Sequence, residues 1–184
     1  MMLKRFPLWI VLLMGVSGCI FSPNKKPPTV TPPPDYPLLI NPFSVLDALA
    51  LAYAARDTNE VKLLYDPVNY TGTSYDSDDQ SSLTFRWRDE VNHVAALVRR
   101  TSITRVQITY PPSRYRFSDL ADPPGWATIQ LLQGNGMNVE ISDSPTSYFF
   151  KSGVSTEFKF IPKTPDSSSP TDTTWKIIHW SEVH

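Results

Sequence analysis

The sequence predicts an α+β fold in which helices come first and antiparallel strands follow. Apolar residues recur at helical spacing between residues 41 and 100, whereas from residue 101 onward they alternate with polar residues, as in strands that bury one face. At 184 residues with an ordinary apolar content, one domain is the expected number. We therefore expect about three helices packed on a curved, mainly antiparallel sheet of five or six strands, all within residues 41–184.

Residues 1–18 have the pattern of a secretory signal peptide. Lys4 and Arg5 give a positively charged start, and the almost wholly apolar residues 8–16 follow it. This run is shorter than the ~20 residues that a membrane-spanning helix needs. It leads into the letters VSGC, whose last residue, Cys19, is the only cysteine in the chain. We expect the chain to be exported.

The letters VSGC resemble the lipobox of bacterial lipoproteins, in which one aliphatic and two small residues precede a cysteine. The resemblance implies that Cys19 receives a diacylglyceryl group, that residues 1–18 are removed, and that the protein is anchored to a membrane of the bacterial cell envelope. Two or more acyl chains anchor stably where one is marginal. Ile20 follows the cysteine, which by the same resemblance favours the outer membrane in a host that has one. An ordinary signal peptide with an unrelated thiol is the alternative.

Residues 19–40 form a proline-dense tract of low complexity. Because proline lacks the backbone donor that helices and strand ladders use, this tract predicts a tether and not a part of the core. As polyproline II, at ~3.1 Å per residue, such a tether would hold a folded domain roughly 60 Å from the membrane. We expect the domain to work in the periplasm or at the cell surface.

The charge of the chain argues against a nucleic-acid partner. Without Lys4 and Arg5, 15 of the 17 basic residues remain to face 18 acidic ones, whereas nucleic-acid-binding domains usually carry a clustered basic excess. A single cysteine cannot form an internal disulfide, and with three histidines in the whole chain no metal site is expected. No glycine-rich phosphate loop occurs either, so we expect no cofactor.

Two helices in tandem are predicted after the tether. Asn41 can cap a helix that begins at Pro42, where the missing proline donor would be unpaired in any case. Asp57 and Glu60 have the spacing of a capping box for a short second helix, which the Asp-Pro pair at 66–67 should end.

A loop and a third helix are predicted next. Residues 71–82 are polar and predict the loop, and residues 85–100 predict the helix. One apolar stripe runs along that helix and contains Trp87, Val91, Val94 and Val98. Glu90 lies off the stripe and can pair with Arg86 four residues earlier, so we expect a solvated ion-pair face there.

The strands are predicted beyond residue 101. Alternation indicates a strand at 105–110 that Pro111 ends. Glycines on both sides of Asn135 predict a tight hairpin turn between strands at 126–133 and 137–142. Three further strands are expected at residues 146–151, 156–162 and 174–183.

In its order of helices and strands the domain resembles the NTF2-like superfamily, which includes SnoaL-type polyketide cyclases, ketosteroid isomerase and scytalone dehydratase. Two local patterns carry the resemblance, namely the alanine-rich helix pair in ALALAYAARDTNEVKLLYDPVNY and the last strand TWKIIHWSEV. It implies a cone with a pocket between sheet and helices, and subunits that can pair as a homodimer. A cystatin-like or other helix-on-sheet fold is the alternative.

Five residues are candidates for contacting a ligand in such a pocket: Tyr53, Tyr65, Trp87, Trp175 and His179. His179 qualifies because in an uninterrupted strand it shares a face with Trp175. Ketosteroid isomerase uses an aspartate base with a tyrosine and a protonated acid. Here Tyr53 is the nearest analogue of that tyrosine, but no acidic residue falls on the inward face of a strand. His93 lies off the helical stripe, so we expect it to be structural or solvated.

The missing acid–base trio favours binding over catalysis. We expect a membrane-tethered envelope protein whose domain binds a partner protein or a small apolar ligand. One alternative is a small enzyme of the isomerase, dehydratase or cyclase type, which needs a buried acid or histidine beside a hydroxyl in a cavity. A lipid carrier is another, for which a deep and wholly apolar cone is expected.

Overall fold

A computed structural model describes residues 32, 34–112, 114–132, 136–151, 155–163 and 174–184 of the chain. The chain divides into two compact units, residues 1–32 and 33–184, and the account below concerns the second unit. The predicted signal peptide, Cys19 and most of the predicted tether lie outside the described residues. In the part of the chain that the structure describes, no helix is both long and apolar enough to span a bilayer.

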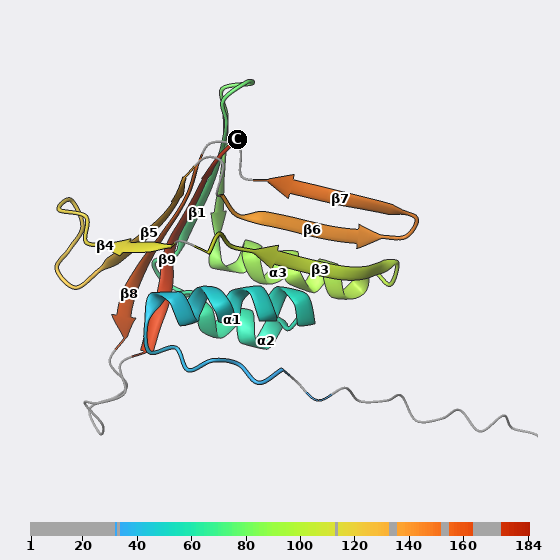
Figure 1. Ribbon diagram of the computed structural model, residues 1–184, viewed down its shortest axis with the longest axis horizontal. Helices are drawn as coiled ribbons and strands as arrows, with labels where there is room; N and C mark the ends of the chain where they lie inside the picture. The colour runs from blue at the N-terminus through green and yellow to red at the C-terminus, as the bar shows by residue number, and fades with distance from the viewer. Residues whose placement is uncertain (1–31, 33, 113, 133–135, 152–154, 164–173) are drawn as a thin grey trace, which may run out of the picture. The chain divides into compact units, whose positions relative to one another are not determined.

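Helices and two sheets make up the second unit (Figure 1), and the α+β prediction is confirmed. The helices are α1 (Pro42–Ala55), α2 (Thr58–Leu64) and α3 (Trp87–Arg99). The strands are β1 (Thr71–Asp76), β2 (Ser81–Arg86), β3 (Ile103–Thr109), β4 (Tyr115–Phe117), β5 (Ala127–Leu132), β6 (Asn138–Asp143), β7 (Thr146–Lys151), β8 (Ser155–Lys163) and β9 (Thr174–Val183).

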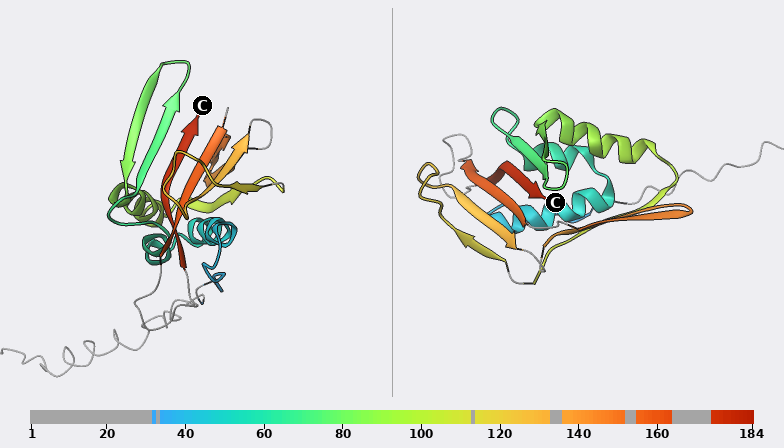
Figure 2. Two further views of the ribbon diagram at one scale, coloured as in Figure 1. Left: turned by 90° about the vertical axis from the view of Figure 1, so that its left-hand side faces the viewer. Right: turned by 90° about the horizontal axis from the view of Figure 1, so that it is seen from above.

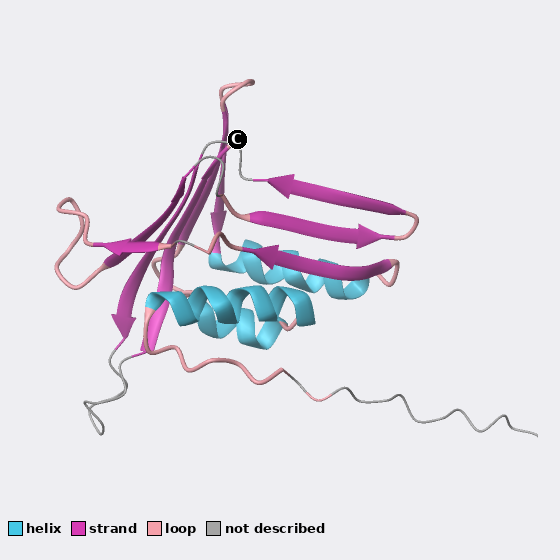
Figure 3. Ribbon diagram, in the orientation of Figure 1, coloured by secondary structure: helices cyan, strands magenta, loops and turns pink. Residues whose placement is uncertain are grey.

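The strands form a larger sheet in the order β2-β1-β9-β8-β5-β4 and a smaller sheet in the order β3-β6-β7. Neighbouring strands run antiparallel, except that β1 runs parallel to β9. Figure 3 shows the three helices grouped together beside the larger sheet, with the smaller sheet alongside them. The sequence predicts one sheet of five or six strands. The structure adds β1, β2 and β4, which local patterns do not reveal, and places β3, β6 and β7 in a sheet of their own.

The first two helices begin where their caps predict. Asn41 Oδ1 accepts a hydrogen bond from the Ser44 backbone N–H at 3.0 Å, and the Asn41 N–H donates to Ser44 Oγ at 3.3 Å. Asp57 Oδ1 accepts from the backbone N–H groups of Asn59 and Glu60. Each bond satisfies a donor that has no partner inside its helix, which fixes the start of that helix.

Residues 71–86 form the β1–β2 hairpin, although the sequence predicts a loop over residues 71–82 and a helix from residue 85. Asp76 Oδ1 closes the turn by accepting from the backbone N–H groups of Asp78 and Asp79. The prediction was wrong because β2 is exposed along most of its length, so it shows no apolar alternation. β1 is held by β9, about a hundred residues later in the chain, in a parallel pairing that no local pattern signals. Figure 2 shows the hairpin rising beside the end of β9.

The Asn-Gly segment at 134–136 does not join two paired strands. β5 pairs with β4 and β8 in the larger sheet, whereas β6 pairs with β3 and β7 in the smaller one. Residues 133–135 themselves lie outside the described part of the chain. Ile129 of β5 lies opposite Phe158 of β8, and both are fully buried, so burial against β8 outweighs a local hairpin.

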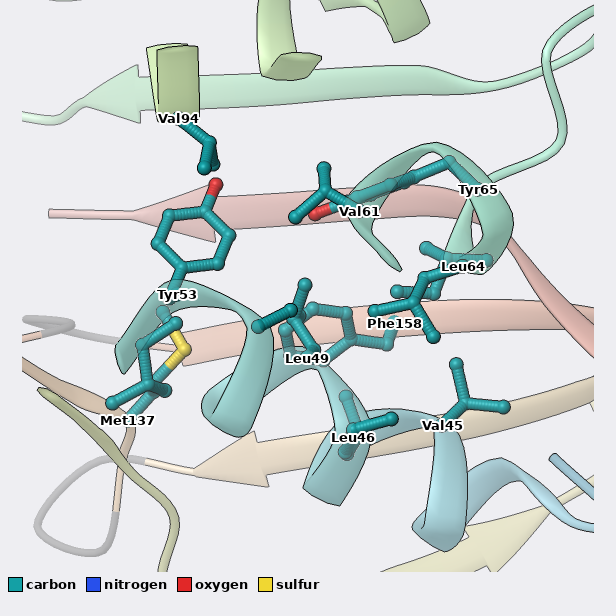
Figure 4. Packing of buried hydrophobic residues seen from close by; sticks show 14 of the residues in the cluster. Val45, Leu46, Leu49, Tyr53, Val61, Leu64, Tyr65, Val94, Met137 and Phe158 are labelled. Carbon is teal, nitrogen blue, oxygen red and sulfur yellow. The ribbon is translucent and has the colours of Figure 1, made fainter. Parts of the chain in front are cut away.

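The core lies where α1 meets both sheets. The inner face of α1 carries Leu46 and Leu49, which are fully buried, and Tyr53, which is nearly so. They pack in one cluster with Phe158 of β8 and Val94 of α3 (Figure 4). Tyr53 is the last buried residue on this face of α1, and Figure 4 shows its hydroxyl pointing toward α3.

Candidate functional site

A cavity of about 680 Å³ lies among α3, the β1–β2 hairpin, the end of β9 and the smaller sheet. Its apolar and aromatic walls come from Tyr53, Phe85, Ile108, Val139, Ile141 and Trp180. Its ionisable lining residues are Asp89, Glu90, His93, Glu182 and His184. The hairpin contributes Gly72, Thr73, Ser74 and Thr84 as well, so the segment predicted as a loop builds one wall of the cavity.

α3 presents Glu90 to the interior together with Val94, whereas Val98 at the end of the predicted apolar stripe faces outward. Glu90 is only 8% exposed, whereas Val98 is 48% exposed. The buried face consists of Glu90, Val94 and Leu97, at positions i, i+4 and i+7. Arg86 does not pair with Glu90, because its guanidinium donates instead to Thr71 Oγ1 at 3.1 Å. The predicted solvated ion-pair face is therefore wrong.

Two tyrosine hydroxyls hold the Glu90 carboxyl. Tyr70 donates to Glu90 Oε1 at 2.6 Å, and Tyr53 donates to Oε2 at 3.4 Å. Burial raises the pKa of Glu90 above its usual range, the negative charges of Glu182 and Asp89 raise it further, and the two hydroxyl bonds oppose the rise. Burial and the neighbouring Glu90 charge raise the pKa of Tyr53 and of Tyr70, so both stay protonated donors.

Glu182 on β9 contributes another carboxyl group to the cavity. Its Oε1 accepts from Trp180 Nε1–H at 3.0 Å, and its Oε2 lies 3.4 Å from His184 Nε2. Burial raises the pKa of Glu182, while the His184 imidazole and the Trp180 bond lower it. Glu182 and Glu90 thus face the same cavity from different elements, and burial raises the pKa of each carboxyl group.

Gly72 gives the Tyr70–Glu90 bond its room. A Cβ on Gly72 would lie 2.6 Å from Tyr70 Oη, 3.2 Å from Glu90 Oε1 and 3.3 Å from Phe85 Cβ. These distances are shorter than ordinary van der Waals contacts, so a side chain at this place on β1 displaces the tyrosine or the carboxyl.

We expect Gly72→Ala to lower the free energy of unfolding by about 1–3 kcal/mol, because it separates a buried hydrogen-bonded pair. Urea denaturation measures the loss. Tyr70→Phe removes the hydroxyl that the new methyl group meets, so the double variant should lose less than the two single losses added together. Strict additivity would show that the hydroxyl and the methyl group do not meet.

The raised pKa of Glu90 makes the free energy of unfolding depend on pH. The folded state holds the Glu90 proton at higher pH than the unfolded state, so the stability that it contributes is present below the unfolded pKa of about 4.5. That stability is lost as pH rises through the folded pKa. Glu90→Gln does not titrate, so we expect wild type to lose stability relative to this variant as pH rises from 4 to 8. Urea denaturation of both chains across this range checks the sign, and a constant difference would contradict it.

Of the five predicted ligand-contacting residues, Tyr53 lines the described cavity. His93 lies beside it. The His93 ring meets the Tyr53 ring edge to face, with centroids 6.1 Å apart. Desolvation lowers the pKa of His93, so its imidazole is neutral at pH 7. The sequence assigns His93 only a structural or solvated role, whereas the structure places it in the lining of the cavity.

The other candidates lie outside the described lining. Tyr65 is fully buried behind the site and packs edge to face on Tyr70, with centroids 4.6 Å apart. Trp87 packs against the core at the start of α3. Trp175 lies under the Arg116 guanidinium, 4.6 Å from it, away from the cavity lining.

His179 is absent from the described lining because β9 contains a bulge. Lys159 of β8 lies opposite His179, but the next residue, Phe160, lies opposite Ile177, which leaves Ile178 as an extra residue. One extra residue exchanges the two faces of a strand. Beyond the bulge Trp180 and Glu182 line the cavity in place of His179.

The acidic residues of the site left a weak signal in the sequence. On α3 the spacing of Glu90, Val94 and Leu97 matches a buried stripe as well as the apolar alternative does. An acid in such a stripe indicates a buried carboxyl that needs partners. The inward position of Glu182 depends on the bulge, and no feature of the sequence signals it.

No protein-family model matches the chain, and no curated protein matches it in sequence. Among solved structures, an NTF2-like superfamily protein from Salmonella enterica serovar Typhimurium matches with a TM-score of 0.51 at 8% identity, over 75% of this chain and 84% of that one. This chain has the NTF2-like fold. The protein Kfla4162 from Kribbella flavida matches with a TM-score of 0.51 at 9% identity, over 77% and 86% of the two chains.

A candidate scytalone dehydratase from Novosphingobium aromaticivorans has the same fold, with a TM-score of 0.50 at 8% identity, over 75% of this chain and 77% of that one. The predicted NTF2-like architecture is therefore confirmed over the cystatin-like alternative. Proteins of this fold include ligand-binding and enzyme-like members, and at these identities the likeness is one of fold alone.

Proposed function

We propose that the NTF2-like domain binds a small, mainly apolar ligand in the cavity beside Glu90 and does so without converting it. The observation that carries the proposal is the cavity itself, whose volume of about 680 Å³ and mixed lining are those of small-molecule sites. A cavity of this kind favours binding of a small ligand over binding of a partner protein. The three carboxyl groups in the lining, those of Asp89, Glu90 and Glu182, argue against the lipid carrier, which needs a wholly apolar interior.

The place of action that we propose is the bacterial cell envelope, with the domain attached to a membrane through lipid on Cys19. The support is the sequence of residues 1–40, in which a charged start, an apolar run, VSGC and a proline-dense tract follow in order. Such a tether would let the domain meet ligands in the periplasm or at the cell surface. The outer membrane remains our proposal for a host that has one, on the identity of Ile20.

Calorimetric titration with 4-phenylbutanol tests the binding proposal. The full chain carrying Cys19→Ala serves as the protein, since it avoids the detergent that a lipidated chain needs. We expect saturable binding that Val139→Trp weakens at least tenfold, because the larger ring fills the cavity. Val98→Trp makes the same change on the exposed side of α3 and should leave affinity unchanged. Absence of saturable binding, or equal effects of both variants, would refute the proposal.

A proton-transfer enzyme is the second candidate, and one observation favours it. Glu90 is a buried acid held by the Tyr53 hydroxyl at a cavity, which is the arrangement that the enzyme alternative needs. Both tyrosine hydroxyls donate to Glu90, so they orient a base and are not free for a developing oxyanion. A protonated Glu182 would supply that donor.

Deuterium exchange distinguishes this enzyme from a binding protein. The protein is mixed in D₂O with 4-phenyl-2-butanone, whose protons α to the carbonyl are acidic, and their loss is followed by NMR. Exchange catalysed by wild type and abolished by Glu90→Gln supports the enzyme. Equal rates with wild type, with the variant and without protein support binding alone.

A further inference from the structure

We propose that the ligand carries a protonated amine, which Glu90 and Glu182 receive inside the cavity while its apolar part lies on the aliphatic wall. This inference rests on the proposed binding function, and it adds the chemical class of the ligand.

Carboxyl groups make up most of the ionisable lining of the cavity. Its lining contains the carboxyl groups of Asp89, Glu90 and Glu182, and among the described lining residues there is no lysine or arginine. The remaining ionisable groups of the described lining are the imidazoles of His93 and His184. A low-dielectric hollow lined by one sign of charge attracts ligands of the opposite sign and repels carboxylates and phosphates.

The carboxyl groups of Glu90 and Glu182 can accept further hydrogen bonds. A carboxylate has about four acceptor sites. Within the described residues Glu90 accepts from Tyr53 and Tyr70, and Glu182 accepts from Trp180 beside His184. Among the described residues no cationic side chain pairs with Glu90, so its ionised form carries an uncompensated cost of burial that a ligand ammonium group would offset.

The rest of the lining suits the body of such a ligand. Ile108, Val139 and Ile141 supply an aliphatic wall from the smaller sheet. The rings of Tyr53, Phe85 and Trp180 line the same space, and aromatic rings attract organic cations as well as apolar groups. A ligand with an aliphatic or aromatic body and one amine therefore matches the lining, whereas an inorganic cation would leave the apolar walls uncovered.

Three probes with one scaffold test the class of ligand. 4-Phenylbutylamine, 4-phenylbutanol and 4-phenylbutanoic acid are titrated at pH 8 into the full chain carrying Cys19→Ala. We expect the amine to bind about tenfold more tightly than the alcohol, since a hydrogen-bonded ion pair replaces a neutral bond, and the acid to bind most weakly. Glu90→Gln and Glu182→Gln should each reduce the preference for the amine severalfold. Glu140→Gln, on β6 but outside the described lining, is the matched control and should preserve it.

The outcomes separate this inference from the function beneath it. Equal or tighter binding of the alcohol overturns the amine while leaving a binding function in place. A preference for the amine that survives both Glu90→Gln and Glu182→Gln also overturns the inference, because the carboxyl groups would then not be its source. Failure of both the amine and the alcohol to bind refutes the inference and the proposed function together.

Discussion

Cys19→Ala is expected to release the protein from membranes completely. The variant removes the sulfur that would carry the diacylglyceryl group, and the apolar residues 8–16 are too few to span a bilayer as a helix. Fractionation of cells into soluble and membrane pools measures the distribution. Metabolic labelling with a fatty acid should mark wild type and leave the variant unlabelled.

Ser17→Ala is the matched control for this experiment, because it keeps a small residue at the same place in the predicted lipobox. This control should stay in the membrane pool and take up label. Continued attachment of the Cys19→Ala chain would contradict a lipid anchor on Cys19. It would mean that residues 1–19 anchor the protein without lipid, or that another part of the chain holds it at the membrane.

Phe158→Ala is expected to cost about 3–5 kcal/mol of unfolding free energy, the usual range for a fully buried phenylalanine. The Phe158 ring is 0% exposed and lies beside one residue of the site. Its centroid is 5.0 Å from that of Trp180, which lines the cavity, and 6.4 Å from that of Tyr110. Removing the ring leaves a void and takes away the support of Trp180.

Urea denaturation of the Phe158→Ala chain measures the loss, with Phe117→Ala as a matched control. Phe117 is 42% exposed on β4, so its replacement should cost about 0.5 kcal/mol or less. The Phe158→Ala chain, where still folded, should also bind 4-phenylbutanol more weakly than wild type. A loss below about 1 kcal/mol would contradict the packing that we describe around β8.

Local signals in the sequence were sufficient for the elements that depend on neighbouring residues. Asn41 and Asp57 cap their helices through side chains three residues or fewer from their partners. β9 alternates buried and partly exposed residues at its start, so its bounds follow from the sequence. Leu46, Leu49 and Tyr53 show their shared face by spacing alone.

The site was harder to predict because it depends on long-range pairing. β1 lies next to β9 only in the folded chain, and this pairing turns a polar segment into a wall of the cavity. The extra residue at Ile178 exchanges His179 for Trp180 and Glu182. The sequence gives Glu90 the character of a surface residue, because charged residues are seldom buried without partners. Its partners Tyr53 and Tyr70 lie 37 and 20 residues away in the sequence, so no local pattern reveals them.

The central claim is that a small ligand enters the cavity beside Glu90, and intermolecular nuclear Overhauser effects test it most directly. The methyl groups of Ile108, Val139 and Ile141 are labelled with carbon-13, and 4-phenylbutylamine is added at saturating concentration. Because these three side chains line the cavity, we predict cross-peaks between their methyl groups and the protons of the probe. Cross-peaks confined to other methyl groups, or none at saturation, would contradict the claim.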